Sequence, residues 1–88
     1  MNIGEAVTAM KAGKCVRRSG WNGKGMHIYL EDDFEWVVGG GVYAGSKRTY
    51  LPHITLFNAQ KQHQPGWNAS TPDLLADDWE EVPYEELK

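Results

Sequence analysis

Eight consecutive residues, from Ser19 to Met26, combine three glycines with a Trp, an Asn and a Lys, directly after the pair Arg17-Arg18. Glycine allows a tight turn and a close approach to a ligand, because it has no Cβ atom to clash. Successive backbone N–H groups in such a turn can bind an anion, and Lys24 would add a positive charge. The aromatic face of Trp21 could stack on a nucleobase, or the side chain could pack under the loop as an anchor of the core. These residues therefore predict a binding site for the phosphates and base of a nucleotide.

Three other residues around this glycine loop (residues 19–26) leave alternatives open. Asn22 could hydrogen-bond a base edge or a ribose, or it could simply hold a left-handed turn. Adjacent strand residues face opposite sides, so only one of Arg17 and Arg18 should point into a given pocket, and we favour Arg18. In the alternative interpretation both arginines are solvated on the surface.

A second group of candidate residues lies between positions 67 and 73. Trp67 is isolated in a polar loop, so it either covers the core or provides a second stacking surface. Ser70, Thr71 and Asp73 cluster at the start of a short helical turn, whose N-terminus could bind a phosphate. Asp73 would repel a phosphate and is better suited to ribose hydroxyls, which donate hydrogen bonds to a carboxylate. Its alternative role is an ordinary negative charge in the first turn of a helix.

The sequence predicts no catalytic residue, no metal site and no cofactor. The three histidines are far apart and no His-Glu-x-x-His run occurs, so a catalytic zinc site has no support. Asp77 and Asp78 have no His or Glu at helical spacing and are interpreted as the entry to a strand. Cys15 is interpreted as a small buried residue rather than a nucleophile. Since it is the single cysteine, an internal disulfide is excluded, which suits a reducing cytoplasm.

Composition narrows the class of protein further. The 88 residues suffice for one domain, expected to span residues 1–88, that buries roughly 60–65% of its unfolded surface. A net charge of −3 argues against a general DNA or RNA binder, although five of the Lys and Arg residues gather between positions 11 and 30. No apolar run reaches the roughly 18–20 residues of a membrane span, and no signal peptide is recognised. We expect a soluble protein of the host cell cytoplasm.

The elements that must position these residues follow from local patterns. Asn2 and Glu5 have the spacing of a capping box, so a helix should begin there, and Gly13 should end it. Residues 15–18 and 27–30 should form two strands joined as a hairpin across the glycine loop.

The remaining segments predict further strands and one short helix. Strands are expected over residues 34–38, 53–58 and 78–82, and a helical turn over Thr71–Ala76 with Thr71 as its cap and Pro72 in first position. Residues 39–49 should be a mobile loop or a distorted hairpin, residues 59–70 a polar loop, and residues 83–88 a frayed end. The predicted fold class is α+β: an N-terminal helix packed on a small, mostly antiparallel sheet, with a short helical turn before the last strand.

Four segments occur in an order typical of a known family. They are Arg17-Arg18-Ser19-Gly20-Trp21-Asn22-Gly23-Lys24-Gly25-Met26, Pro52-His53-Ile54, Trp67-Asn68-Ala69-Ser70, and Asp73-Leu74-Leu75-Ala76-Asp77-Asp78-Trp79. On these segments the chain resembles the second family of phage Thoeris anti-defence proteins, from the N-terminal helix to Val82. The resemblance implies a homotetramer without enzymatic turnover. It would capture the cyclic ADP-ribose-type messenger made by the Thoeris TIR protein and so prevent activation of the effector. Some relatives also capture cyclic dinucleotides at a separate site.

The resemblance and the residue chemistry together define the candidate binding set. Its members lie in or directly before the glycine loop, or near the start of the short helical turn: Arg18, Trp21, Asn22, Gly23, Lys24, Gly25, Met26, Trp67, Ser70 and Asp73. Three alternatives to a cyclic ADP-ribose sponge remain. They are a sponge for cyclic dinucleotides, a module that inhibits a host defence protein by direct contact, and a small enzyme that cleaves the nucleotide with Asp73.

Overall fold

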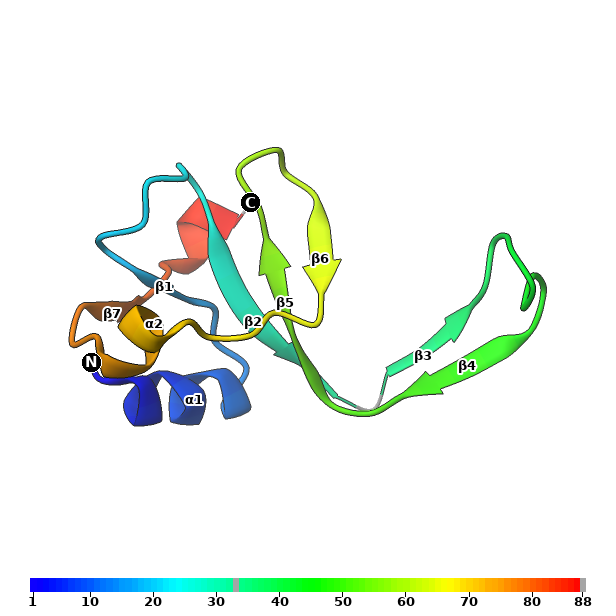
Figure 1. Cartoon of the computed structure of the whole chain (residues 1–88), viewed down its shortest axis with the longest axis horizontal. Coiled ribbons are helices and arrows are strands. Elements are labelled where there is room, and N and C mark those ends of the chain that lie inside the picture. Colours follow the sequence, from blue (N-terminus) through cyan, green and yellow to red (C-terminus); the bar gives the residue numbers. More distant parts are fainter. Residues whose placement is uncertain (33, 88) are drawn as a thin grey trace.

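The computed structural model describes residues 1–32 and 34–87, apart from the side chains of 34–36. Its elements in chain order are α1 (Ile3–Lys11), β1 (Val16–Arg18), β2 (His27–Glu31), β3 (Phe34–Val37), β4 (Lys47–Tyr50), β5 (His53–Phe57), β6 (His63–Pro65), α2 (Thr71–Leu75), β7 (Trp79–Glu81) and the 3₁₀ turn η1 (Tyr84–Leu87) (Figure 1). The predicted α+β fold class, with its N-terminal helix and short helix before the last strand, is confirmed.

Helix α1 begins and ends where the sequence predicts. The Asn2 Oδ1 atom accepts a hydrogen bond from the Glu5 backbone N–H at 2.8 Å, and Glu5 Oε1 accepts one from the Asn2 backbone N–H at 3.0 Å. Gly13, with a φ angle of +88°, follows the helix in a conformation that favours glycine. The buried residues of α1 are Ala6, Ala9 and Met10.

Five strands form one antiparallel sheet in the order β6-β5-β2-β1-β7. Val16 pairs with Ile28, and Ile28 pairs with Leu56, so these side chains share one face of the sheet. Helix α1 packs on this face, and the core there includes Trp79 of β7 (Figure 1). The predicted β1–β2 hairpin is confirmed, and the glycine loop is its turn.

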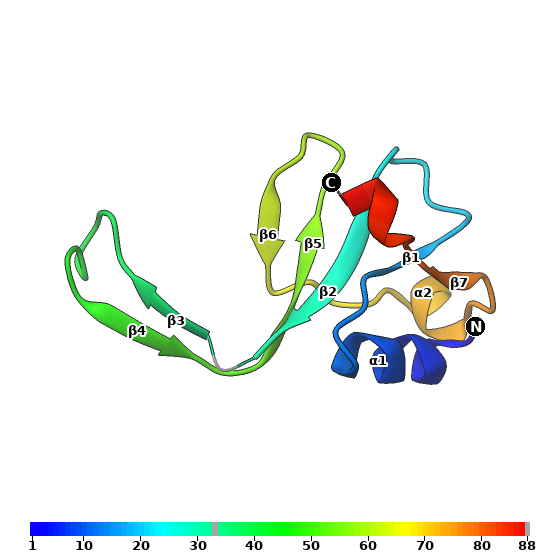
Figure 2. The same cartoon turned by 180° about the vertical axis from the view of Figure 1, so that it is seen from behind.

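The opposite face of the sheet is more open. Side chains alternate along a strand, so Arg17, His27, Tyr29 and Phe57 lie on the face away from α1. The turn η1 covers one end of this face, and it is in front of the sheet in Figure 2. The predicted frayed end at residues 83–88 is therefore wrong over η1, where Arg17 binds Glu86 and the Glu86 N–H donates to the Pro83 carbonyl at 2.9 Å.

Strands β3 and β4 form a separate two-stranded arm that extends away from the body (Figures 1 and 2). The arm, residues 34–50, connects β2 to β5, and its strands pair from Phe34 with Tyr50 to Val37 with Lys47. The guanidinium of Arg48 lies over the Tyr43 and Tyr50 rings, at 5.3 and 5.8 Å from their centroids. Of the two predictions for residues 39–49, a mobile loop or a distorted hairpin, the hairpin is observed. Its second strand, β4, begins at Lys47, inside the segment predicted to be irregular.

Two boundaries near the candidate site differ from the sequence prediction. The polar loop predicted over 59–70 contains β6, because Pro65, Gln64 and His63 pair with β5 and extend the sheet without any apolar alternation of their own. The cap of α2 is Ser70 rather than Thr71: the Ser70 Oγ accepts a hydrogen bond from the Asp73 N–H, and the Ser70 N–H donates one to Asp73 Oδ2. This reciprocal pair is a capping box, which Thr71 inside the helix could not form.

Candidate functional site

The glycine loop is held by short-range contacts at one end of the sheet. The Trp21 N–H donates to the Arg18 carbonyl at 3.1 Å, and the Met26 N–H donates to the Gly23 carbonyl at 3.2 Å. Gly25 has a φ angle of +80°, which favours glycine. A Cβ atom added to Gly23 would lie 1.8 Å from the Met26 Sδ atom, so Gly23 is required for this close approach.

Trp21 belongs to a group of three tryptophans at the edge of the core. Its ring centroid is 5.3 Å from Trp79 and 6.1 Å from Trp67, both in edge-to-face geometry. Trp79 is buried, whereas Trp21 and Trp67 are half-buried and pack against the core cluster. The Trp21 indole N–H also donates to Asp73 Oδ1 at 3.4 Å. Trp21 and Trp67 are thus brought together, and each keeps part of its surface exposed.

Arg18 links the glycine loop to α2 and to the strand that follows it. Its Nη1 donates to Asp73 Oδ1 at 2.9 Å, and its Nε donates to Asp78 Oδ1 at 2.8 Å. Burial alone would raise the pKa of Asp73, but hydrogen bonds from Arg18, Ser70 and Trp21 bring it below its usual value. The hydrogen bond from Arg18 is the main reason that the pKa of Asp78 is also lowered. Both carboxylates are therefore ionised at neutral pH and already matched by a cation.

A small cavity of about 240 Å³ lies against the glycine loop. Five members of the candidate set line it, namely Arg18, Trp21, Gly23, Gly25 and Met26. Arg17 lines it as well, although its guanidinium binds Glu80 and Glu86 rather than the carboxylates that Arg18 binds. Trp67, Ser70 and Asp73 are not part of its lining but are in contact with Trp21 or Arg18 or with each other, whereas Asn22 is exposed.

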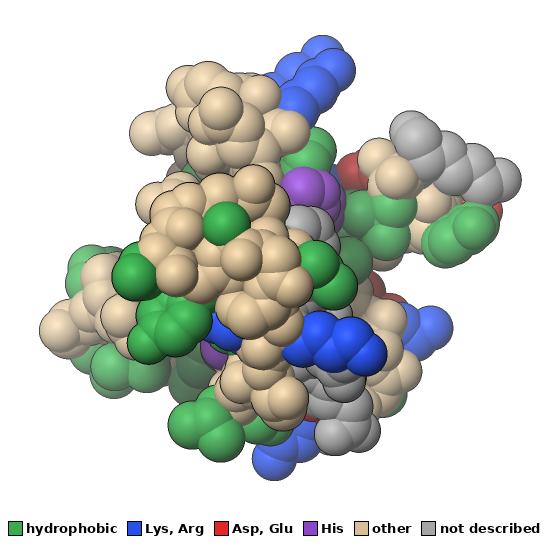
Figure 3. All heavy atoms as spheres, turned by 90° about the vertical axis from the view of Figure 1, so that its right-hand side faces the viewer, with side chains coloured by type: hydrophobic (Ala, Val, Ile, Leu, Met, Phe, Trp, Pro, Cys, Tyr) green, Lys and Arg blue, Asp and Glu red, His purple; other side chains and the backbone are tan. Residues whose placement is uncertain are grey.

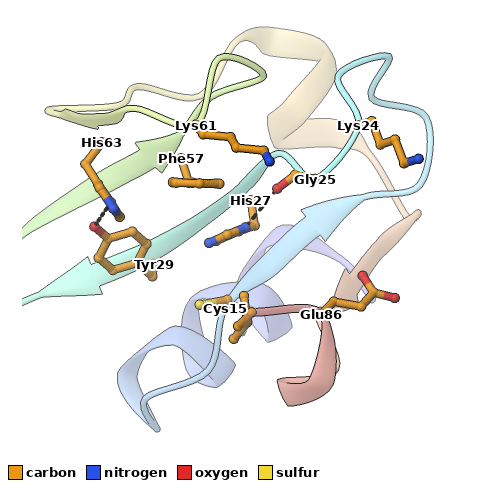
Figure 4. Close-up of a pocket in the computed structure, with 10 residues that line it drawn as sticks. Cys15, Lys24, Gly25, His27, Tyr29, Phe57, Lys61, His63 and Glu86 are labelled. Carbon is orange, nitrogen blue, oxygen red and sulfur yellow. Dashed lines mark hydrogen bonds between the residues drawn. The ribbon is translucent and has the colours of Figure 1, made fainter.

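A larger cavity of about 630 Å³ lies on the open face of the sheet. Lys24 and Gly25 of the glycine loop line it together with eight residues outside the candidate set: Cys15, His27, Tyr29, Phe57, Lys61, His63, Glu86 and Leu87 (Figure 4). The glycine loop thus forms a wall of both cavities, with Gly25 lining each. The alternation of His27 and Tyr29 along β2 was a signal for a shared face, but the pairing with β5 and β6 was needed to find their neighbours.

The lining of the larger cavity is aromatic, with two lysines. The His27 ring stacks on Phe57 at a centroid distance of 5.0 Å and an interplanar angle of 25°, and the Tyr29 hydroxyl is 2.6 Å from His63 Nδ1 (Figure 4). Burial lowers the pKa of His27 and raises the pKa of Tyr29 to about 12. Both rings are therefore neutral at pH 7. Such a surface suits a planar ring, and Lys24 and Lys61 supply charges for an anionic group.

Other kinds of site find no support in the described residues. Among residues 1–32 and 34–87, no three His, Cys, Asp or Glu side chains are grouped so that they could hold a metal ion. A helix suited to spanning a membrane is also absent from the described part of the chain.

Comparison with known proteins assigns the chain to a family. The model of the Tad2-like domain, described as a Thoeris anti-defense 2-like domain, matches residues 1–82. The chain belongs to the Thoeris anti-defense 2 family. Thoeris anti-defense 2 of Bacillus phage SP01 is 33% identical over 86 residues, which cover 93% of this chain and 94% of the relative. The resemblance seen in the sequence is confirmed, and membership of the Thoeris anti-defense 2 family supports a phage anti-defence role.

The matched segment contains most of the candidate site. The glycine loop, Trp67, Ser70 and Asp73 all lie within residues 1–82 of the Thoeris anti-defense 2-like match. The turn η1 begins at Tyr84 and lies outside it.

Proposed function

We propose that the chain is a single domain, residues 1–88, that binds a cyclic ADP-ribose-type second messenger and sequesters it without cleavage. Sequestration would keep the messenger from the Thoeris effector and so protect the phage. The observation that supports this most is the match to the Thoeris anti-defense 2-like domain over residues 1–82. The glycine loop, with a cavity on each side, is compatible with such a ligand.

The proposed binding site is built on the glycine loop. The larger cavity, at about 630 Å³, falls within the range of roughly 300–1,000 Å³ that is usual for small-ligand pockets. Lys24 and Lys61 would neutralise a pyrophosphate, and the His27–Phe57 pair offers a flat surface for adenine. On the other side of the loop, Trp21 and Met26 would contact the ligand from the smaller cavity.

The state of the nearby carboxylates favours binding over cleavage. A general acid or base works best when its pKa is close to the working pH. Asp73, the residue that an enzyme would need near the ribose, instead has a lowered pKa and is held by Arg18, Trp21 and Ser70. Burial raises the pKa of Cys15, so its thiol is a poor nucleophile at neutral pH.

We further propose that the chain acts as a homo-oligomer, with four subunits as in the family it resembles. An isolated two-stranded hairpin is marginally stable in water, yet the arm extends away from the body. Four exposed large apolar side chains lie on or beside it: Val37, Val42, Tyr43 and Leu51. Figure 3, the view onto this end of the molecule, has hydrophobic and basic side chains together on the surface. A second copy of the chain would cover them and help to enclose the ligand.

Isothermal titration with cyclic ADP-ribose isomers, with cyclic dinucleotides in parallel, tests the proposal. We expect nanomolar binding of a cyclic ADP-ribose isomer, and a loss of affinity of at least about tenfold in both Trp21→Ala and Lys24→Ala. Lys11→Ala, at the end of α1, is the matched control and should bind as the wild type does. Mass spectrometry of ligand released by heat should return it intact, whereas a cleaved product would indicate an enzyme.

Two other outcomes of the same titration would favour a different function. Binding of cyclic dinucleotides alone would make the protein a sponge for that class of signal. No binding across the panel, combined with capture of a host protein in the absence of nucleotide, would favour the protein-interaction module.

A further inference from the structure

One carboxylate interrupts the basic lining of the larger cavity. Among the described residues that line it, Lys24 and Lys61 are the lysines and Glu86 is the acid. Glu86 comes from η1, which lies outside the segment that matches the family. Glu86 therefore belongs to a turn that the family match does not include, and it changes the charge that a ligand would meet in the cavity.

The position of Glu86 is fixed by contacts on both sides. Val82 is buried, and its N–H donates to the Cys15 carbonyl at 2.9 Å, which anchors the start of the turn to the body. At the other end, Arg17 Nη1 donates to the Glu86 carboxylate, while Arg17 Nε donates to Glu80 at 2.9 Å. Two carboxylates thus already bind this guanidinium.

The charge of Arg17 reaches the cavity. Burial is the main reason that the pKa of His27 is lowered, and the positive charge of Arg17 contributes to the same shift. Arg17 itself lines the smaller cavity rather than the larger one, and both Glu80 and Glu86 bind its guanidinium. These three side chains together carry a net charge of −1, and Glu86 brings this negative charge into the lining of the larger cavity.

We propose that Glu86 is a specificity-determining residue, which rejects nucleotides that end in a terminal phosphate and admits those whose phosphates are all diesters. This inference rests on the proposed function, because it assumes that the larger cavity receives a nucleotide. A phosphate monoester carries a charge of about −1.5 to −2 at pH 7, more than a diester carries. The two lysines can neutralise the two diester charges of a cyclic pyrophosphate, whereas a terminal phosphate needs a further cation.

Repulsion by a like charge is a common source of specificity between similar ligands. Linear ADP and ATP share adenine, ribose and pyrophosphate with a cyclic ADP-ribose-type ligand, so the aromatic surface of the cavity cannot distinguish them. The terminal phosphate can, because the Glu86 carboxylate in the cavity lining repels it. A sponge with this feature would not be filled by linear nucleotides.

Titration of ADP, ATP and inorganic pyrophosphate into the Glu86→Gln variant tests this inference. We expect ADP and ATP to bind Glu86→Gln at least about tenfold more tightly than the wild type. Affinity for the cyclic ligand should change by less than about threefold. Glu85→Gln changes the net charge equally on the neighbouring residue of η1, outside the cavity lining, and should leave all affinities as in the wild type. A chain ending at Pro83, which lacks η1, should behave as Glu86→Gln does.

The outcomes separate this inference from the proposed function. Equal ADP binding by wild type, Glu86→Gln and Glu85→Gln would overturn the role of Glu86, and so would the absence of ADP binding by both Glu86→Gln and the shortened chain. Tighter ADP and pyrophosphate binding by Glu86→Gln, with no binding of cyclic ADP-ribose isomers by any variant, would support the role of Glu86 and overturn the proposed ligand.

Discussion

Arg18 and Asp73 are 55 positions apart in the sequence, yet Arg18 Nη1 lies 2.9 Å from Asp73 Oδ1. This ion pair joins the strand before the glycine loop to the first turn of α2. The Trp21 indole donates to the same carboxylate oxygen. The two groups of candidate residues are therefore one connected unit, and a change at Asp73 will be transmitted to Trp21.

The ion pairs of Arg18 with Asp73 and Asp78 should make the stability of the fold depend on pH in the acidic range. Asp73 and Asp78 have lowered pKa values in the folded protein, so their contribution is complete above the ordinary Asp pKa of about 3.9 and is lost as the pH falls through the folded values. Arg18→Gln should lower the urea midpoint at pH 7, and the difference from the wild type should shrink below about pH 3. Urea unfolding at both pH values, followed by circular dichroism, measures this.

Arg17→Gln is the comparison variant for that experiment. Its partners Glu80 and Glu86 are 45% and 49% exposed, whereas Asp73 is 13% exposed. Exposed ion pairs contribute little, because water and salt screen them. We expect Arg17→Gln to have the smaller effect, and a larger effect than Arg18→Gln would contradict this ranking.

His27 should destabilise the fold when it is protonated. Burial lowers its pKa in the folded state, so the folded protein is favoured above the unfolded His pKa of about 6.5 and loses stability as the pH falls through the folded value. His27→Phe keeps a ring stacked on Phe57 and should lose less stability than the wild type between pH 7.5 and 5. Thermal unfolding at the two pH values is the measurement. Equal losses of stability in the wild type and in His27→Phe would show that other groups cause the acid sensitivity.

Gly23 and Met26 should be energetically coupled. A Cβ atom at Gly23 would lie 1.8 Å from Met26 Sδ and 2.5 Å from its Cγ, so Gly23→Ala forces the Met26 side chain to move. Because Met26 is flexible and half-buried and can move, the cost should lie at or below the low end of the about 1–3 kcal/mol that overpacking costs in a core. Met26→Ala in the same chain removes the clash and should recover part of that cost. A double-mutant cycle in urea tests this, and additive effects would show that the two sites are independent.

The arm should be removable without unfolding the body. Glu31 pairs with His53, so replacing residues 32–52 by Asn-Gly would join β2 and β5 through a two-residue hairpin turn. No described residue in that range belongs to the main core cluster, and we expect cooperative thermal unfolding to persist. Light scattering should report a smaller assembly than that of the full chain. Loss of cooperative unfolding would contradict the independence of the body, and an unchanged assembly would contradict the proposed role of the arm.

Local patterns were sufficient for the helix and the first hairpin. The Asn2–Glu5 capping box and Gly13 fix α1, and glycines at 20, 23 and 25 mark the turn between β1 and β2. The short helix was also predictable, and its cap could have been predicted too. Ser70 and Thr71 have similar cap preferences, but Ser70 is the one with an acidic residue three positions later, which is the spacing of a capping box. In the structure the Ser70 N–H donates to Asp73 Oδ2.

The larger cavity depends on long-range register, which local patterns do not contain. His27 faces Phe57 because β2 pairs with β5, and Phe57 faces His63 because β5 pairs with β6. The polar strand β6 has no alternation to identify it, so its histidine could not be assigned to a site. The same holds for Glu86, whose approach to Arg17 requires the chain to return over the open face of the sheet.

The pair Glu31–His53 lies at the base of the arm, between two regions whose sequences are constrained differently, the arm and the five-stranded sheet. Residues added in opposite pairs along β3 and β4 would lengthen the arm and leave every partner in the five-stranded sheet unchanged. The arm can therefore diversify in length and surface while the body and its cavities stay constant. Such a layout would let new assemblies evolve around an unaltered pair of cavities.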